Sequence, residues 1–274
     1  MSAKADARKA CPQDEIPPMS FLARFKRRPP APAREPARIP DGERVYAIGD
    51  IHGRDDLFAD LLDRITADCK SRVQATTTLI LLGDLVDRGP SSSSVVERAM
   101  AIGAPFDHVR MLVGNHEEAF LAALGGDIQR LRYFVRIGGD ATIRSYWHDD
   151  ASYAAATFEE VAARLPAIVP ERHSRFLAGG EDMIRIGDYV FVHAGVRPGR
   201  ALCDQKIKDL RWIRDEFISA EPDWEETVVH GHTISKQVDI GRNRIGIDTG
   251  AYASGTLTAI GLEAGQQWII DTAD

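Results

Sequence analysis

Five short runs of apolar residues recur along the chain, and each run ends directly in a loop of glycine and polar residues. The runs occupy residues 45–48, 78–82, 109–113, 189–192 and 227–229. Runs of this length that end at glycine or other turn-forming residues are typical of buried β-strands. Parallel strands place their carboxyl ends on one edge of a sheet, and sites in α/β proteins collect there. The pattern therefore predicts five strands whose following loops meet at one place.

Helical periodicity fills the first two gaps between these strands. Residues 54–70 carry apolar side chains at positions 57, 58, 61, 62 and 65, and residues 91–103 carry them at positions 95, 96, 99 and 100. Such spacing favours amphipathic helices. Residues 118–124 continue as a helix after the third apolar run. The strand–helix–strand–helix–strand opening predicts a parallel βαβ arrangement.

The second half of the chain predicts a helical insertion and then short strands. Residues 125–180 are mainly helical in pattern, and we interpret them as a cap beside the site. Strands are expected at residues 237–240, 244–250, 256–260 and 267–270. Residues 241–243 and 263–265 suit hairpin turns. We therefore expect an α/β fold in which two mixed β-sheets pack as a sandwich, with helices outside and a helical cap insertion.

Residues 1–40 differ in composition from the rest of the chain. They are rich in proline, and they hold nine Lys or Arg and four Asp or Glu, a net charge of +5. The remaining residues therefore carry a charge of −12, because the whole chain has −7. We expect residues 1–40 to form a disordered basic tail and residues 41–274 to form the folded domain. Within the tail, residues 20–28 could form a short basic helix that contacts a membrane surface or a partner protein.

Composition excludes several classes of protein. An acidic body argues against nucleic-acid binding, which usually requires a basic face. No apolar run approaches the roughly 20 residues that span a bilayer, and the first residues lack the apolar stretch of a signal peptide. The three cysteines lie far apart in sequence, which indicates a reducing compartment without a disulfide framework. We therefore predict a cytoplasmic protein without a transmembrane segment.

The loops after the predicted strands supply six oxygen and nitrogen donors, with His230 nearby. These donors are Asp50, His52, Asp84, Asn115, His193 and His232. A mixed set of carboxylate, amide and imidazole donors suits Mn²⁺, Fe²⁺ or Zn²⁺ better than Ca²⁺, and it is large enough for two ions. Two neighbouring divalent ions can clamp a phosphate group and make hydroxide available near neutral pH. Side chains two positions apart in an extended segment share a face, so we expect Asp50 and His52 to project from one face and to hold one ion together.

Four further residues have the chemistry of a phosphate-processing site. His116 directly follows Asn115, so we expect its imidazole to lie near the metal ions without binding them. Asp87 could orient the His116 ring and raise its pKa, and the pair would then be a general acid for the leaving group. Arg88 would hold phosphate oxygens, for which a guanidinium is well shaped. Arg214 is a second candidate for this role.

These motifs resemble the phosphoprotein phosphatase branch of the calcineurin-like metallophosphoesterases, in particular the bacterial and phage-type serine/threonine phosphatases. The resemblance covers about residues 44–272 and rests mainly on Gly-Asp-Ile-His-Gly (49–53), Gly-Asp-Leu-Val-Asp-Arg-Gly (83–89) and Gly-Asn-His-Glu (114–117), with His-Ala-Gly (193–195) and Gly-His-Thr (231–233) as shorter matches. It implies a β-sandwich flanked by helices. It also implies phosphoester hydrolysis by direct attack of a metal-activated hydroxide, usually with manganese and with iron or zinc as alternatives.

The resemblance also assigns the donors. It implies that Asp50 and His52 hold the first ion and that Asp84 bridges the two ions. The resemblance also implies that Asn115, His193 and His232 hold the second ion. It points to His232, and not to His230, as the histidine ligand of that loop. His116 with Asp87 then forms the acid pair, and Arg88 with Arg214 binds phosphate. Tyr252 occupies a position at which relatives often carry a residue near the site.

The motifs are compatible with more than one class of substrate. His-Ala-Gly and His-Gly-His-Thr depart from the eukaryotic pattern and point to the bacterial group, whose neighbours include symmetrical diadenosine tetraphosphate hydrolases. Those enzymes tend to have Ala in place of Asp87 and Asp in place of Glu117, so this chain favours phosphomonoesters, with phosphoserine and phosphothreonine in proteins as leading substrates. The other hypotheses are a dinucleoside polyphosphate or other small phosphorylated substrate, and a binding scaffold without activity. The complete set of donors argues against the scaffold.

Overall fold

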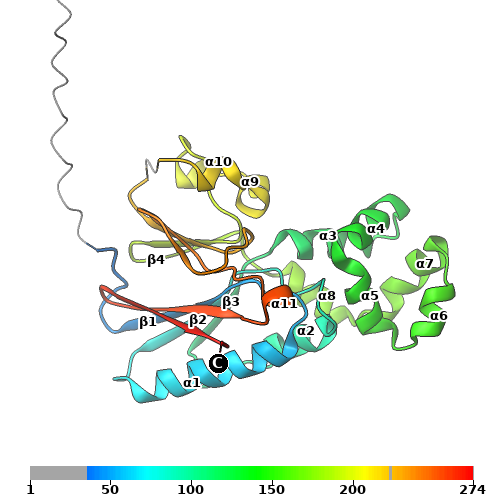
Figure 1. Cartoon of the computed structure of the whole chain (residues 1–274), viewed down its shortest axis with the longest axis horizontal. Coiled ribbons are helices and arrows are strands. Elements are labelled where there is room, and N and C mark those ends of the chain that lie inside the picture. Colours follow the sequence, from blue (N-terminus) through cyan, green and yellow to red (C-terminus); the bar gives the residue numbers. More distant parts are fainter. Residues whose placement is uncertain (1–35, 222–223, 274) are drawn as a thin grey trace, which may run out of the picture. The chain divides into compact units, whose positions relative to one another are not determined.

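The computed structural model describes residues 36–221 and 224–273, and its elements are drawn in Figure 1. The tail prediction for residues 1–35 lies outside this range. The first sheet has the strand order β10-β9-β1-β2-β3. Its strands β1, β2 and β3 are parallel, while β9 is antiparallel to both β1 and β10. The bounds of the strands are β1 (Glu43–Ile48), β2 (Thr76–Leu81), β3 (His108–Met111), β9 (Thr258–Glu263) and β10 (Gln266–Asp271).

The second sheet has the strand order β4-β5-β6-β8-β7 and is also mixed. Strands β5, β6 and β8 are parallel, and the edge strands β4 and β7 are antiparallel to their neighbours. The bounds are β4 (Met183–Ile186), β5 (Tyr189–Val192), β6 (Thr227–His230), β7 (Asp239–Ile240) and β8 (Arg244–Gly246). The prediction of two mixed sheets is therefore confirmed. The predicted strand 244–250 ends early, at Gly246.

Alternating side chains of each strand build three apolar clusters. Val45 and Ala47 on β1 point between the two sheets, where they pack with Phe191 on β5 and Ile245 on β8. Tyr46 on β1 and the other outward residues of the first sheet pack against helices. On the far side of the second sheet, a third cluster packs β5 and β6 against two short helices, α9 (Ile207–Trp212) and α10 (Asp215–Ile218). Sheets on the inside and helices on the outside are the predicted sandwich.

The helices of the first half follow the predicted βαβ order. Helices α1 (Asp55–Ser71) and α2 (Ser92–Met100) connect the parallel strands, as their apolar spacing predicts. Helix α3 spans Asn115–Ala123, so the motif Gly-Asn-His-Glu opens a helix, whereas the sequence pattern predicted its start at residue 118. The reason is that Gly114 acts as the N-cap residue while the Glu117 side chain accepts the backbone N–H of Gly114. Asn115 and His116 therefore lie in the first helical turn.

The segment predicted as a cap consists of short helices. Figure 1 shows them together on one side of the described fold, beside α3. Their bounds are α4 (Ile128–Phe134), a π-helical turn η1 (Val135–Gly139), α5 (Asp140–Trp147), α6 (Asp150–Ala155), α7 (Phe158–Ile168) and α8 (Glu171–Ala178). Their apolar side chains join the cluster that also contains α1 and α2. The interpretation of this segment as a cap remains a prediction. The remaining short helices are η2 (Leu202–Asp204) and α11 (Ala251–Ser254).

Residues 36–40, which we assigned to the tail from their composition, pack on the sandwich. Ile39 is 1% exposed and belongs to the cluster between the sheets, and its backbone N–H donates to the carbonyl of Ala264. The backbone N–H of Arg38 donates to the carboxylate of Asp188. The apolar side chain of Ile39 therefore joins the core in spite of the prolines on either side of it.

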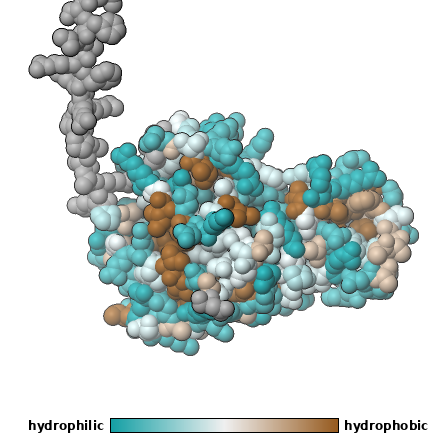
Figure 2. Space-filling view, in the orientation of Figure 1, coloured by the Kyte–Doolittle hydropathy of each residue, from teal (hydrophilic) through white to brown (hydrophobic). Residues whose placement is uncertain are grey.

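The surface of the described chain is largely polar. Figure 2 shows hydrophilic residues over most of one face, with a band of apolar atoms over the region of the strands. The exposed large apolar side chains include Ile240 on β7 and Ile269 on β10, which are strands at the sheet edges. Among the described residues, every helix is too short or too polar to cross a bilayer.

Candidate metal centre

The loops after β1, β2, β3, β5 and β6 meet where the two sheets come together. The backbone N–H groups of Ile51 and His52 donate to the carbonyl of Asp84, which joins the first two loops. Across the sandwich, His193 Nδ1 lies 2.9 Å from the carbonyl oxygen of Leu82, and the N–H of Gly231 donates to the carbonyl of His193. The five loops predicted from the apolar runs therefore form one site.

Asp84 lies at the centre of the site, with one carboxylate oxygen toward each of two histidines. Its Oδ2 atom is 3.6 Å from His52 Nε2, and its Oδ1 atom is 3.4 Å from His193 Nε2. Asp84 is 1% exposed. One carboxylate that faces two separate imidazoles has the geometry of a ligand shared by two cations, as the resemblance implies for this residue.

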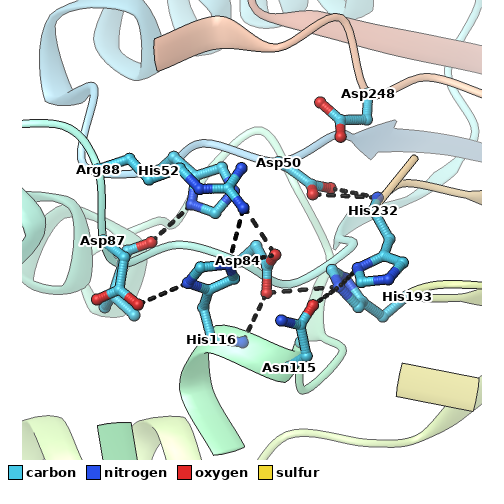
Figure 3. A network of polar contacts seen from close by, with 12 residues as sticks. Asp50, His52, Asp84, Asp87, Arg88, Asn115, His116, His193, His232 and Asp248 are labelled. Carbon is cyan, nitrogen blue, oxygen red and sulfur yellow. Dashed lines mark hydrogen bonds and ion pairs between the residues drawn. The ribbon is translucent and has the colours of Figure 1, made fainter. Parts of the chain in front are cut away.

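Donor atoms gather in two groups that share Asp84 (Figure 3). One group contains His52, Asp84 and His116, and the other contains Asp84, His193 and His232. Asn115 completes the second group, because its Oδ1 atom lies 3.1 Å from His193 Nε2. His193 Nε2 in turn lies 3.2 Å from His232 Nδ1. The structure thus brings Asp84 together with four of the other five predicted metal ligands.

Asp50, the sixth, stands beside His232. Its two carboxylate oxygens accept the backbone N–H of His232 at 3.0 and 3.2 Å. Our expectation that Asp50 and His52 share one face of an extended segment is wrong. His52 has φ = 46°, which is a left-handed conformation, so the alternation of a β-strand does not apply there. A tight loop, and not the pleat of a strand, sets the directions of the two side chains.

Buried imidazoles in this site are arranged as metal ligands. His52 Nδ1 lies 2.8 Å from the carbonyl oxygen of Val86 and donates its proton there, so Nε2 presents a lone pair. Within the described part of the chain, Nε2 of His52 and Nε2 of His232 are buried without a hydrogen-bond partner. Burial lowers the pKa of His52 to about 3 and the pKa of His232 to about 2, which favours the neutral, metal-binding form. These residues fit divalent transition-metal ions.

The pKa values of Asp50 and Asp84 are shifted in opposite directions, although both carboxylates are buried in the same site. Burial raises the pKa of Asp50 well above its usual value, and the charge of Asp248 adds to this effect. Burial would also raise the pKa of Asp84, but the positive charges of His193 and His116 outweigh it and hold that pKa well below its usual value. Asp84 is therefore ionised near neutral pH, which suits the bridging role that the resemblance implies for it.

Backbone strain concentrates in the site. Five candidate residues have positive φ angles although they are not glycine: His52, Asp84, Asp87, Arg88 and His232. Non-glycine residues rarely adopt this conformation, and such strain persists mainly where function requires it. Two glycines of the motifs have a related purpose. A Cβ atom would lie 2.1 Å from an Asp84 oxygen if placed on Gly114 and 2.0 Å from an Asp50 oxygen if placed on Gly231. Glycine lets both carboxylates approach the neighbouring backbone closely.

His116 and Asp87, which we predicted as an acid pair, lie in direct contact. His116 Nδ1 and Asp87 Oδ2 lie 2.6 Å apart, and both residues are buried. Burial lowers the pKa of His116, but the charge of Asp84 and the hydrogen bond to Asp87 raise it by more, so the net shift is upward. The other ring nitrogen, Nε2, lies 3.8 Å from Asp84 and 3.1 Å from the guanidinium of Arg88. It therefore faces the same space as His52, and its role as an acid stays a prediction.

Arg88, which we predicted to bind phosphate, lies next to Tyr252, which the resemblance suggested as a residue near the site. The guanidinium of Arg88 stacks over the ring of Tyr252 at 4.8 Å, and that ring packs edge-to-face with His52. Arg214 approaches from the opposite side, where its guanidinium donates a 2.9 Å hydrogen bond to the carbonyl of His232. Arg214 also lines a cavity of about 480 Å³ with Arg197 and Lys208. Positive charge thus lies next to the predicted ligand His52 through Arg88 and next to the predicted ligand His232 through Arg214.

From the sequence we assigned no structural role to three residues of the site. Asp248 is 2% exposed, and the run before it ends in a polar loop, the signal that identified the other strands. The carboxylate of Glu117 accepts backbone N–H groups of Asp84, Leu85 and Gly114, which fixes the loop after β2. Thr142 on α5 contacts Asp87, and nothing near it in the sequence indicates this.

Comparisons with known proteins agree with this description. A family model described as calcineurin-like phosphoesterase matches residues 43–251. A solved structure of a candidate diadenosine tetraphosphatase has a TM-score of 0.58 and 22% identity, and the match covers 87% of this chain and 99% of that chain. The cold-active protein-tyrosine phosphatase of a psychrophilic Shewanella species has a TM-score of 0.50 and 17% identity, with 85% and 83% covered. At these identities the two structures show a common fold.

Curated relatives match a shorter stretch. The symmetrical bis(5'-nucleosyl)-tetraphosphatase of Delftia acidovorans (strain DSM 14801 / SPH-1) is 44% identical over 82 residues, which are 30% of this chain and 26% of that protein. The protein of the same name from Klebsiella pneumoniae (strain 342) is 41% identical over 82 residues, with the same shares covered. The matches therefore span about a quarter of the length of these relatives.

The matched region of the family model runs from the first residue of β1 to the first residue of α11. It includes strands β1, β2 and β3 of the first sheet, the whole second sheet and every predicted metal ligand. The predictions of a metallophosphoesterase fold and of an enzyme are thereby confirmed. On this evidence the chain belongs to the calcineurin-like phosphoesterase family.

Proposed function

We propose that this chain is a metal-dependent phosphomonoesterase that removes phosphate from serine and threonine side chains of proteins. Two divalent ions, with manganese as the first choice, supply positive charge for the phosphate oxygens and a water of lowered pKa when they are bound. The residues that hold them are the six predicted ligands, grouped around Asp84: Asp50, His52, Asp84, Asn115, His193 and His232. Their buried and unpartnered imidazole nitrogens support this assignment.

The observation that carries the proposal is the contact between His116 and Asp87. Hydrolysis of a serine or threonine phosphate expels an alkoxide, a strong base that requires a proton as the P–O bond breaks. A nucleoside diphosphate leaves as a phosphate anion, whose second pKa is only about 6, so it leaves without that help. A buried imidazole 2.6 Å from a carboxylate can supply the proton. The pair therefore favours an alcohol as the leaving group.

Phosphate recognition follows from the two arginines. Arg88 is held between His116 and the Tyr252 ring, which directs its guanidinium toward the space next to His52. Arg214 is fixed from the other side by its hydrogen bond to His232. Two planar guanidinium groups can bind separate oxygens of one phosphate group and so orient its phosphorus atom.

A symmetrical dinucleoside tetraphosphate hydrolase is the second candidate. The observation in its favour is the similarity to symmetrical bis(5'-nucleosyl)-tetraphosphatases over 82 residues, together with the similar fold of a candidate diadenosine tetraphosphatase. Such a substrate would use the same metal ligands and arginines. It would not require the His116–Asp87 pair, and this difference separates the two candidates by experiment.

The test compares substrates with good and poor leaving groups. Manganese-loaded wild-type protein is assayed on p-nitrophenyl phosphate, a phosphoserine peptide and diadenosine tetraphosphate. We expect higher kcat/KM on the phosphopeptide than on the dinucleotide. In His116→Asn and Asp87→Asn, turnover of the phosphopeptide should fall by about 10²-fold or more, and turnover of p-nitrophenyl phosphate should fall much less. Preferred cleavage of the dinucleotide to two nucleoside diphosphates would favour the second candidate instead.

A further inference from the structure

We propose that Asp248 is a further residue of the metal centre, whose unpartnered carboxylate oxygen faces the predicted ligands from the Asp50 side and strengthens divalent-ion binding. The inference rests on the proposed metal-dependent function. It assigns a role to a residue that lies outside the motifs by which the metal ligands were identified.

The carboxylate of Asp248 is buried and only half satisfied. The residue is 2% exposed, and its Oδ1 atom accepts the backbone N–H of Gly250 at 2.9 Å. Its Oδ2 atom is buried without a hydrogen-bond partner in the described part of the chain. A buried carboxylate oxygen without a partner is costly, and native structures rarely leave one without a reason.

The backbone holds Asp248 at the edge of the site. Strand β8 ends two residues earlier, and the N–H of Ile247 donates to the carbonyl of His230. The carbonyl of Asp248 accepts the N–H of Ser235, in the loop that follows His232. Figure 3 shows the Asp248 side chain on the Asp50 side of the site, with its oxygens directed toward the other ligands.

The charges around the Asp248 carboxylate also favour a cation beside it. Asp50 and Asp84 both repel a negative charge on Asp248, while His193 and Arg88 provide the positive charges that act on it. Within the described chain, neither Asp50 nor Asp248 has a lysine or arginine within ion-pair distance, and the ion pairs of Asp84 are with histidines. Three buried carboxylates without a lysine or arginine between them are typical of a cation site, because a divalent ion offsets their repulsion.

A purely structural role is the competing explanation. The bond from the Gly250 N–H to Asp248 Oδ1 stabilises the turn that leads into α11, and it would require the residue even without a metal. Asp248→Asn separates the two explanations, since asparagine keeps the side-chain oxygen for Gly250 and removes the charge. Asp248→Ser does the same with a hydroxyl and provides a second variant if the first folds poorly.

The experiment measures metal binding directly. Chelator-treated wild-type protein, Asp248→Asn, Asp248→Ser and the control Asp107→Asn are titrated with MnCl₂ in a calorimeter, and their Tm values are measured in EDTA and in MnCl₂. Asp107 suits as a control because its carboxylate also accepts a backbone N–H, that of Thr77. We expect the Asp248 variants to bind one of two Mn²⁺ ions about 10- to 100-fold more weakly, and the control to bind as wild type does.

The Tm values add a second readout. Removal of the charge should raise the Tm in EDTA, because repulsion from Asp50 and Asp84 is relieved, and should reduce the rise that MnCl₂ produces. Wild-type Mn²⁺ affinity in both Asp248 variants, or an equal loss of Tm with and without Mn²⁺, would assign the residue to the fold alone and overturn the inference. Failure of the wild type itself to bind Mn²⁺ would overturn the proposed function as well.

Discussion

The hydroxyl of Thr142 donates a 2.6 Å hydrogen bond to the carboxylate of Asp87, on the oxygen opposite the one that meets His116. The same hydroxyl accepts the backbone N–H of Asp87 at 2.8 Å. Thr142 lies on α5, in the predicted cap segment, and is fully buried. This segment therefore does more than lie beside the site, because it holds one member of the predicted acid pair in place.

Thr142→Val should lower kcat while the rest of the fold stays intact. Valine has nearly the shape of threonine but leaves both the Asp87 N–H and one carboxylate oxygen without this partner, so Asp87 can rotate away from His116. We expect kcat on a phosphoserine peptide to fall by about tenfold, a fraction of the 10²–10⁴ that a full general acid contributes. Steady-state kinetics over a range of pH would check this, and the alkaline limb of the profile, where the general acid loses its proton, should shift to lower pH.

Thr142→Ser supplies the control for that experiment, because serine retains the hydroxyl. It should recover most of the activity and the wild-type pH profile. Equal activity of Thr142→Val and wild type on the phosphopeptide would show that Thr142 does not position Asp87 for catalysis.

Arg214→Ala should weaken substrate binding without emptying the metal site. Its guanidinium contacts the carbonyl of His232 and not the ring, so the ring can keep its position as a ligand. We expect KM for phosphate esters to rise by about tenfold or more and Mn²⁺ affinity, measured by calorimetry, to change little. The neighbouring Arg211, which is paired with Asp182 and Glu118, is the matched control. An unchanged KM in Arg214→Ala would remove this residue from the phosphate site.

We expect the ionisation of Asp68, which lies outside the predicted metal centre, to make the stability of the fold depend on pH. Its carboxylate accepts hydrogen bonds from Tyr46 and Arg72. Burial raises the pKa of Asp68, but these partners lower it by more, so the folded protein has the lower pKa. The ionised carboxylate therefore stabilises the fold above the unfolded pKa of about 3.9, and this contribution is lost as the pH falls through the folded pKa.

Denaturant unfolding of wild type and Asp68→Asn measures this contribution. At pH 7 the variant should be less stable, and the difference should shrink as the pH falls below 4. A difference of constant size across that range would mean that the charge of Asp68 is not what stabilises the fold.

The loop that carries Asp84 could be predicted from local sequence alone. The apolar run before it and the glycine next to it indicate a strand followed by a loop, and both are local properties of the chain. The same rule applies to the run that ends before Asp248, although we read residues 244–250 as one strand. The structure ends β8 at Gly246 and frees Asp248 to face the site. Strand length depends on the partner strand, which a single sequence does not show.

The contact between Thr142 and Asp87 could not be predicted from local sequence patterns. The two residues are 55 positions apart, and the helix that carries Thr142 has an ordinary amphipathic pattern. The directions of Asp50 and His52 also escaped sequence reasoning, because a left-handed backbone at His52 replaced the expected extended segment.

The sequence by itself determined the strands, their loops and the kinds of donor at the site, since alternation, glycine and polar residues act over a few neighbouring positions. Only the tertiary structure decided which donor atoms face one another, which carboxylate remains unpartnered and which helix supports the acid pair. Those relationships depend on how distant elements pack against each other, and packing is a property of the whole fold.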